Sequence, residues 1–182
     1  MGSPWCVVLV LAVGCGNKKD DNAATTGTPA GPAKAAMPAG FVDVNNLDGL
    51  IIKVPPDAKV KDNSLVVGWF ENADKSFAIT IKPVGEDATD IEALKTVIKD
   101  QVKDWLKQEK TADGFILTYS APKIEMVDDG AGGFARKEVG LEYGLQMRRI
   151  IAGHPFKCAA GTITTPGGLE AVIAACNSIR AK

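Results

Sequence analysis

Four cysteines carry most of the chemistry that this sequence could perform. Cys6 and Cys15 lie in or at the end of an apolar stretch near the N-terminus, and Cys158 and Cys176 lie near the C-terminus. A thiol can accept a lipid, form a disulfide, bind a metal or act as a nucleophile. The last two cysteines and the one histidine, His154, lack the ligand count and spacing of a zinc site, so we expect no metal.

No other residues form a recognisable catalytic group. His154 stands between a glycine and a proline, which is typical of a turn, and no G-x-S-x-G elbow supplies a serine nucleophile. The glycine-rich run 130–133 lacks the Lys-Ser/Thr of a phosphate loop, so we interpret it as a hairpin loop. Glu138 and Glu142 could serve acid–base chemistry, but nothing in the sequence pairs them. We expect no enzymatic activity and no cofactor.

Cys15 has the sequence context of a lipidated cysteine. The apolar stretch 5–13, WCVVLVLAV, has the length of a signal-peptide core and is too short to span a membrane. Residues 11–15, LAVGC, resemble the lipobox of bacterial lipoproteins, in which the cysteine receives diacylglycerol before cleavage just ahead of it. The alternative is a buried N-terminal strand with an incidental cysteine.

The resemblance to bacterial lipoproteins implies a signal peptide at 1–14 and membrane attachment through lipid on Cys15. Ala12 departs from the usual Leu, and residues 1–5 lack the usual Lys or Arg. Gly16 replaces the Asp of an inner-membrane retention signal, so the resemblance favours the outer membrane, facing the periplasm or the cell surface.

The segment after the lipobox is expected to be a tether. Residues 16–40 are small and polar and rich in Gly, Pro, Ala and Thr, so they cannot bury enough apolar surface to offset their ordering entropy. We therefore divide the chain into a signal peptide, a lipidated and flexible segment at 15–40, and one folded domain at 41–182. The net charge of −1 disfavours a nucleic-acid partner.

The folded domain is expected to be α+β. Short apolar or alternating runs predict strands at 49–54, 65–70, 77–81, 115–119, 141–151 and 156–163. Apolar residues at three- and four-residue spacing predict a long amphipathic helix at about 89–109, opened by a Thr89–Glu92 capping box. A second helix, at about 166–181, follows Thr165 and Pro166. Both helices are expected to pack on an antiparallel sheet.

Cys158 and Cys176 are expected to form a disulfide between the last strand and the last helix. Cys176 shares a helical face with Leu169, Val172 and Ile179, and Cys158 lies on the strand just before that helix. An exported chain meets an oxidising compartment, in which such a pair forms a bond. Two free buried thiols are the alternative. Arg149 interrupts the apolar phase of its strand, so we expect it at a strand end, at a bulge or beside an acidic partner.

The order of elements resembles the PsbP/Mog-type α/β/α sandwich, on weak motifs such as IIKVPPDA, FAITIKPV and CNSIR. Members of that fold are mostly non-catalytic, which implies an accessory or binding domain with a possible envelope protein as its partner. The alternative is a carrier or sensor for a small ligand bound between sheet and helix. A closed aromatic core would favour the first hypothesis, and a cavity of about 300 Å³ or more with converging polar groups would favour the second.

Overall fold

The structure, a computed structural model, describes residues 37–47, 49–61, 67–85 and 90–182. They belong to one of the two units into which the chain divides, residues 34–182. The predicted signal peptide, Cys15 and most of the predicted tether therefore lie outside the described residues.

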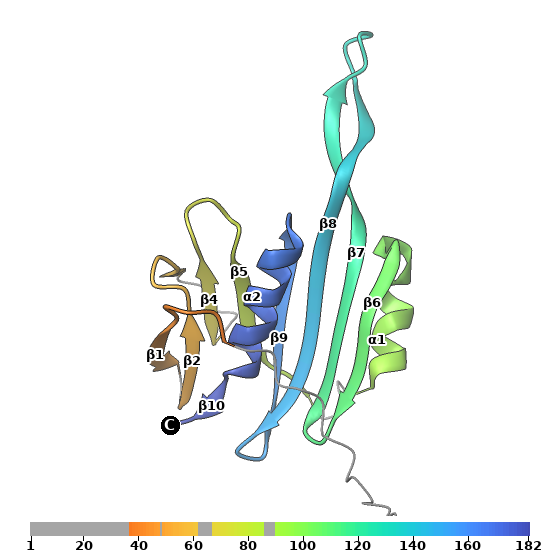
Figure 1. Ribbon diagram of the computed structural model, residues 1–182. Coiled ribbons are helices and arrows are strands. Elements are labelled where there is room, and N and C mark those ends of the chain that lie inside the picture. The colour runs from red at the N-terminus through yellow and green to blue at the C-terminus, as the bar shows by residue number, and fades with distance from the viewer. Residues whose placement is uncertain (1–36, 48, 62–66, 86–89) are drawn as a thin grey trace, which may run out of the picture. The chain divides into compact units, whose positions relative to one another are not determined.

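A seven-stranded antiparallel sheet forms the centre of this unit, and a three-stranded sheet lies beside it (Figure 1). The spatial orders are β3-β4-β5-β9-β8-β7-β6 and β1-β2-β10. The strands are β1 (Val42–Leu47), β2 (Leu50–Val54), β3 (Lys59–Val60), β4 (Gly68–Glu71), β5 (Ala78–Pro83), β6 (Asp104–Thr111), β7 (Gly114–Asp128), β8 (Phe134–Ile151), β9 (His154–Ile163) and β10 (Arg180–Ala181).

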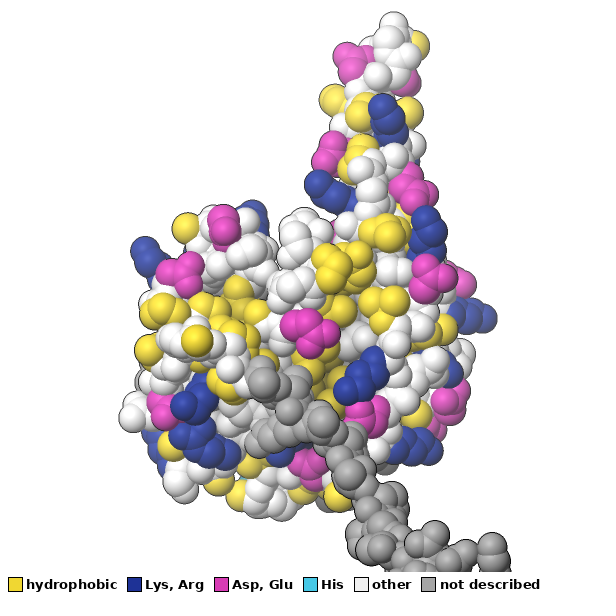
Figure 2. Space-filling model, viewed as in Figure 1, with side chains coloured by type: hydrophobic (Ala, Val, Ile, Leu, Met, Phe, Trp, Pro, Cys, Tyr) yellow, Lys and Arg dark blue, Asp and Glu magenta, His cyan; other side chains and the backbone are white. Residues whose placement is uncertain are grey.

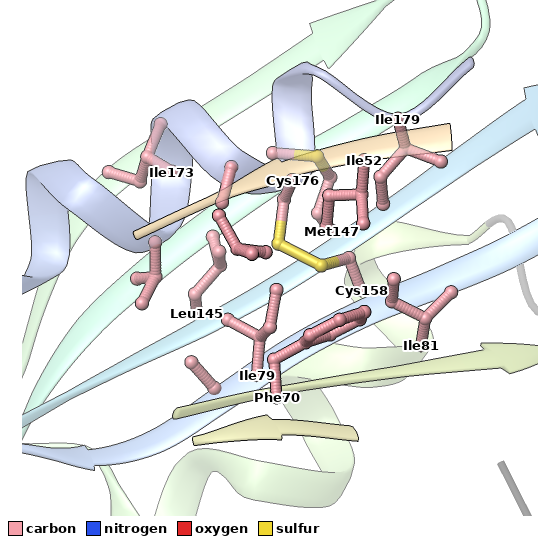
Figure 3. Packing of buried hydrophobic residues seen from close by; sticks show 14 of the residues in the cluster. Ile52, Phe70, Ile79, Ile81, Leu145, Met147, Cys158, Ile173, Cys176 and Ile179 are labelled. Atoms are coloured by element: carbon pink, nitrogen blue, oxygen red, sulfur yellow. A yellow bond between two sulfur atoms is a disulfide. The ribbon is translucent and has the colours of Figure 1, made fainter. Parts of the chain in front are cut away.

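One face of the seven-stranded sheet packs against helix α2 (Pro166–Asn177) and strand β2. Thr165 caps the helix by accepting a hydrogen bond from the Gly168 amide, and Pro166 occupies its first turn, as the sequence predicted. Apolar side chains from every second position of β2, β4, β5, β8 and β9 fill this main core (Figure 3). We call this side of the sheet the α2 face.

The opposite face is covered only in part, by the short helix α1 (Ile91–Ile98), and is called the α1 face. Ile91 and Ile98 pack on Phe115, Leu117 and Tyr119 of β7. Asp90 caps α1 by accepting a hydrogen bond from the Glu92 amide. The predicted capping residue Thr89 lies outside the described residues.

The expected α+β fold is wrong, because the predicted long helix at 89–109 does not exist. Helix α1 ends at Ile98, a 3-10 turn covers Lys99–Gln101, and residues 104–111 form the edge strand β6. The described residues are mostly strand, in two antiparallel sheets with two short helices. The element order behind the PsbP/Mog-type sandwich required that helix, so this architecture is not the observed one.

The C-terminal helix is also shorter than expected. It ends at Asn177, and Arg180 and Ala181 leave it to pair with Ile51 and Leu50 of β2. The predicted disulfide is confirmed: Cys158 and Cys176 are bonded with their Cα atoms 5.8 Å apart. Both cysteines are buried in the main core (Figure 3).

Candidate functional site: the β7–β8 arm and the α1 face

Strands β7 and β8 continue beyond the sheet as a two-stranded arm, residues 122–141 (Figure 1). Within the described residues, β6 pairs with β7 only as far as Ser120, and β9 pairs with β8 only from Tyr143. From the pair Pro122–Leu141 to the pair Asp128–Phe134, β7 and β8 pair only with each other. At about 3.3 Å per residue, this stretch is roughly 23 Å long.

One face of the arm carries an apolar strip. Residues directly opposite each other in an antiparallel pair point to the same side, and so does every second residue along a strand. The register therefore places the five apolar members of the strip on one side of the arm, together with the charged residues Asp128, Arg136 and Glu138. The five members are Pro122, Ile124, Met126, Phe134 and Leu141. Phe134 is 72% exposed and Met126 is 60% exposed. Figure 2 shows hydrophobic side chains along the arm, interleaved with charged ones.

The tip of the arm is fixed by two aspartates. Asp128 accepts a hydrogen bond from the Gly130 amide, and Asp129 accepts hydrogen bonds from the amides of Ala131 and Gly133. The backbone hydrogen bonds from Ala131 and Gly133 lower the pKa of Asp129. The predicted hairpin loop at 130–133 is thus confirmed. It closes an extended ribbon whose outer backbone edges are unpaired, which is the geometry that accepts a further strand.

A groove crosses the α1 face at the base of the arm. It consists of two hollows, of about 390 Å³ and about 590 Å³, which share Tyr119, Gly161 and Thr162 as lining residues. Strand β9 bulges at the groove, because two of its residues, Gly161 and Thr162, intervene between the pairs Leu145–Ala160 and Tyr143–Ile163. A Cβ atom on Gly144 would collide with the Tyr119 ring, so the tyrosine lies across this glycine.

The smaller hollow carries polar and aromatic groups from four strands. Trp69 and Thr80 line one side, and Gln146 and Tyr119 line the other. The side-chain oxygen of Gln146 is buried and accepts no hydrogen bond from any described residue. A buried acceptor without a donor costs free energy, so a donor from a bound molecule or water would stabilise this site.

Three cations lie in one row beside this hollow. Lys82 of β5 is directly opposite Lys157 of β9, which is directly opposite Arg148 of β8. Arg148 is also opposite Phe115, which packs under α1, so the row is on the α1 face. Burial lowers the pKa of Lys157, and the charges of Arg148 and Lys82 lower it further. Burial likewise lowers the pKa of Arg148. We call Lys82, Lys157 and Arg148 the cation row.

The residues considered from sequence do not assemble into a catalytic group. His154 is exposed at the start of β9, just after a turn at 152–153 rather than within one. Glu138 forms an ion pair with Lys103 at 3.2 Å, and Glu142 lines the larger hollow. Among the described residues, no group of three or more His, Cys, Asp or Glu could hold a metal ion.

No protein-family model matches this chain, and no curated protein sequence matches it significantly. In the part of the chain that is described, no helix is long and apolar enough to cross a membrane.

Proposed function

We propose that this chain is a lipoprotein of the cell envelope whose domain binds a protein partner through the arm. Lipid on Cys15 holds it on a membrane, with the outer membrane as the proposed address. The domain carries out no catalysis. The lipobox-like LAVGC and the polar segment that follows it support the anchor. The buried Cys158–Cys176 disulfide is the type of bond that proteins keep in oxidising compartments.

The observation that carries the partner-binding proposal is the exposed arm. A ribbon that only stabilised its own sheet would have neighbours on its edges or an apolar face turned inward. Here the apolar strip is at the surface, where exposed apolar groups are typical of interaction sites. Strand addition would pair the free backbone edges, and the strip would provide pockets or ridges for specificity.

Site-specific photocrosslinking in intact cells tests this proposal. A photoreactive phenylalanine analogue replaces Phe134 on the strip and, as a matched control, Val97 on α1, which is 76% exposed. We expect an adduct of one defined mass from position 134 and none from position 97. Equal labelling from both positions, or no adduct from the arm, would contradict the proposal.

The groove supports a second candidate function, the binding of a small ligand between the sheet and α1. Its hollow of about 390 Å³ and the unsatisfied Gln146 oxygen favour this candidate. Gly161 lines both hollows, and a Cβ there would meet no atom within 4 Å. Gly161→Trp should therefore fill the groove without unfolding the domain, and should abolish ligand binding. Retained binding would place the ligand elsewhere.

A further inference from the structure

We propose that the groove on the α1 face binds a neutral oligosaccharide, with Trp69 as the ring on which a sugar unit stacks. The inference deepens the second candidate function and rests on it, because the site is the same groove. It adds the chemical class of the ligand, which follows from the side chains that line the groove and from their charges.

One row of side chains crosses the sheet at the smaller hollow. Trp69 of β4 is directly opposite Thr80 of β5, which is opposite Ala159 of β9. Ala159 is opposite Gln146 of β8. Gln146 is opposite Leu117, which packs under α1, so the row is on the α1 face. From β4 to β8 the row crosses three strand spacings, about 14 Å in total. It therefore places an aromatic ring, a hydroxyl group and an amide group along one line.

The floor between the two aromatic side chains of this hollow is low. Ala78, Ala159 and Gly161 line it on β5 and β9, the strands that follow β4 toward β7 in the sheet. Trp69 is half-buried, so part of its ring remains accessible. A sugar ring presents C–H groups on its faces and hydroxyl groups around its edge. An indole ring beside small side chains offers an apolar surface to such a face and leaves the hydroxyl groups free to form hydrogen bonds.

The polar groups of the hollow suit hydroxyl groups of a ligand. The Thr80 hydroxyl donates to the Ala159 carbonyl oxygen at 3.4 Å, and its oxygen can still accept a hydrogen bond. Thr162 lines both hollows. The side-chain oxygen of Gln146 accepts no hydrogen bond from the described residues. A ligand hydroxyl that reached this oxygen would supply the missing donor, which favours a ligand rich in hydroxyl groups over a purely apolar one.

The charges that line the groove nearly cancel. Glu71 and Lys75 line the smaller hollow, and Asp100, Glu142 and Arg136 line the larger one. Three acids therefore face two bases. Binding sites for charged molecules carry charges of the opposite sign, so this balance favours a neutral ligand. The two hollows share three lining residues, which gives the ligand room for more than one ring.

The test titrates the full chain with three neutral oligosaccharides, maltotetraose, cellotetraose and tetra-N-acetylchitotetraose. Calorimetry and tryptophan fluorescence follow binding, and the neutral apolar dye N-phenylnaphthylamine is the comparison probe. Trp69→Leu is the test variant, because it keeps an apolar side chain and removes the ring. Trp69→Phe is the conservative variant. Phe134→Leu, which removes an exposed ring from the arm, is the matched control. Circular dichroism melts show that each variant is folded.

We expect at least one of the three oligosaccharides to bind. Trp69→Leu should weaken its binding about three- to tenfold, since the stacking surface is lost. Trp69→Phe should keep most of the affinity but lose the fluorescence change, whereas Trp105→Phe should keep that change. Phe134→Leu should bind as wild type does. Absence of binding by all three oligosaccharides, or equal weakening by Trp69→Leu and Phe134→Leu, overturns the proposal.

Gly161→Trp separates the class of the ligand from the existence of the site. It should abolish binding of the oligosaccharide and of the dye, because it fills the groove. If the dye binds the wild type but not Gly161→Trp, and no oligosaccharide binds, the groove is a ligand site and the oligosaccharide proposal fails. If an oligosaccharide binds wild type and Gly161→Trp equally, the sugar lies outside the groove and both proposals fail.

Discussion

At the scale of single residues, Arg149 connects three parts of the chain. Its Nε donates to Asp113 at 2.8 Å, and its Nη1 donates to the carbonyl oxygens of Asn177 and Ile179 at 3.1 and 3.0 Å. These carbonyls lie at the C-terminal end of α2, where a positive charge interacts favourably with the helix dipole. Arg149 therefore links the β6–β7 turn to the end of the last helix.

Replacing Arg149 should destabilise the domain more than replacing an ordinary surface arginine. For Arg149→Met we expect the free energy of unfolding to fall by about 1–2 kcal/mol, because the helix end loses its cap and Asp113 loses its partner. Arg180→Met is the control, since its ion pair with Asp43 is exposed and contributes about 0–1 kcal/mol. Urea unfolding of both variants measures the difference. Equal losses would contradict the capping role.

Asp113 makes part of this stability dependent on pH. Burial by itself raises the pKa of Asp113, but hydrogen bonds from Arg149 and Thr111 and the Arg149 charge outweigh it, so the net pKa is lowered. The contribution is therefore complete above the unfolded value of about 3.9 and is lost as the pH falls below about 4. The difference in the free energy of unfolding between wild type and Asp113→Asn should shrink as the pH is lowered from 5 to 2. Denaturant unfolding curves of both proteins, recorded at several pH values in this range, measure it. A constant difference would exclude the ion pair as its source.

Some residues could be placed from sequence and others could not. Arg149 interrupts an apolar alternation, which predicted an acidic partner or a strand irregularity, and Asp113 confirms the partner. The cation row has no such local signal. Lys82 and Lys157 each occupy a normal exposed or half-exposed position in their own strand, and only the pairing of β5 with β9 brings them together. Cross-strand register between distant segments was not available from one sequence.

At the scale of the elements, the disulfide joins α2 to a central strand of the sheet. Cys158 pairs in register with Ile81 and Met147, and Cys176 lies on the buried side of the helix (Figure 3). Eighteen positions separate the two cysteines. A disulfide that closes a loop of this length lowers the conformational entropy of the unfolded chain, which stabilises the folded state by about 3 kcal/mol.

Reduction of the disulfide should lower the melting temperature by about 6–12 °C, from about 3 kcal/mol and about 2–4 °C per kcal/mol. Thermal melts with and without reductant measure the shift. A Cys158→Ala/Cys176→Ala variant should melt low under both conditions. Thiol titration of the folded Cys6→Ser/Cys15→Ser chain should find no free thiol before reduction; any reactive thiol in that chain would contradict the pairing.

The arm should be dispensable for folding. Its residues belong to neither hydrophobic core of the described chain, since Ala121 is the last residue of β7 in a core and Tyr143 is the first of β8 that packs against one. Replacing residues 123–140 by a two-residue Asn-Gly turn should change the melting temperature by less than about 5 °C, because few buried contacts are removed. Circular dichroism melts check this, and the same variant should no longer co-purify with the partner that position 134 crosslinks in the full chain. Unfolding of the variant would show that the arm stabilises the sheet.

Segments with a buried face were predictable, and those without one were not. The alternation in β9 and in the sheet part of β8 follows from one buried side, and the start of α2 follows from Thr165 and Pro166. The prediction that the helix continues beyond Ile98 depended on the spacing of three apolar residues, Val102, Trp105 and Leu106. Trp105 packs on Tyr119 across the β6–β7 pair, while Leu106 is 50% exposed at a bulge, so the two do not share a helical face. Pairing with β7 overrides local helix preference here. The arm has no buried side, and its second strand, FARKEVG, shows no alternation of apolar and polar residues.

At the scale of the whole molecule, the proposed lipid anchor on Cys15 would hold the arm and the groove close to a membrane. Cys15→Ser should remove fatty-acid labelling and transfer the protein from the detergent phase to the aqueous phase, because stable membrane residence needs the acyl chains. Metabolic labelling and phase partitioning of wild type and variant measure this. Cys6→Ser is the matched control and should be labelled as wild type is. Equal labelling of wild type and Cys15→Ser would rule out the lipobox.

The position of β10 has a consequence for how fast the protein folds. Strand β2 obtains its second neighbour only when Arg180 and Ala181 pair with Ile51 and Leu50, and Lys182 then donates to the Gly49 carbonyl at 2.9 Å. Contacts between such distant segments carry a large loop-closure cost and slow folding. The small sheet therefore remains incomplete until residues 180–182 have paired with β2. We expect this pairing to be among the late steps of folding, because residues 50 and 181 are far apart in the sequence.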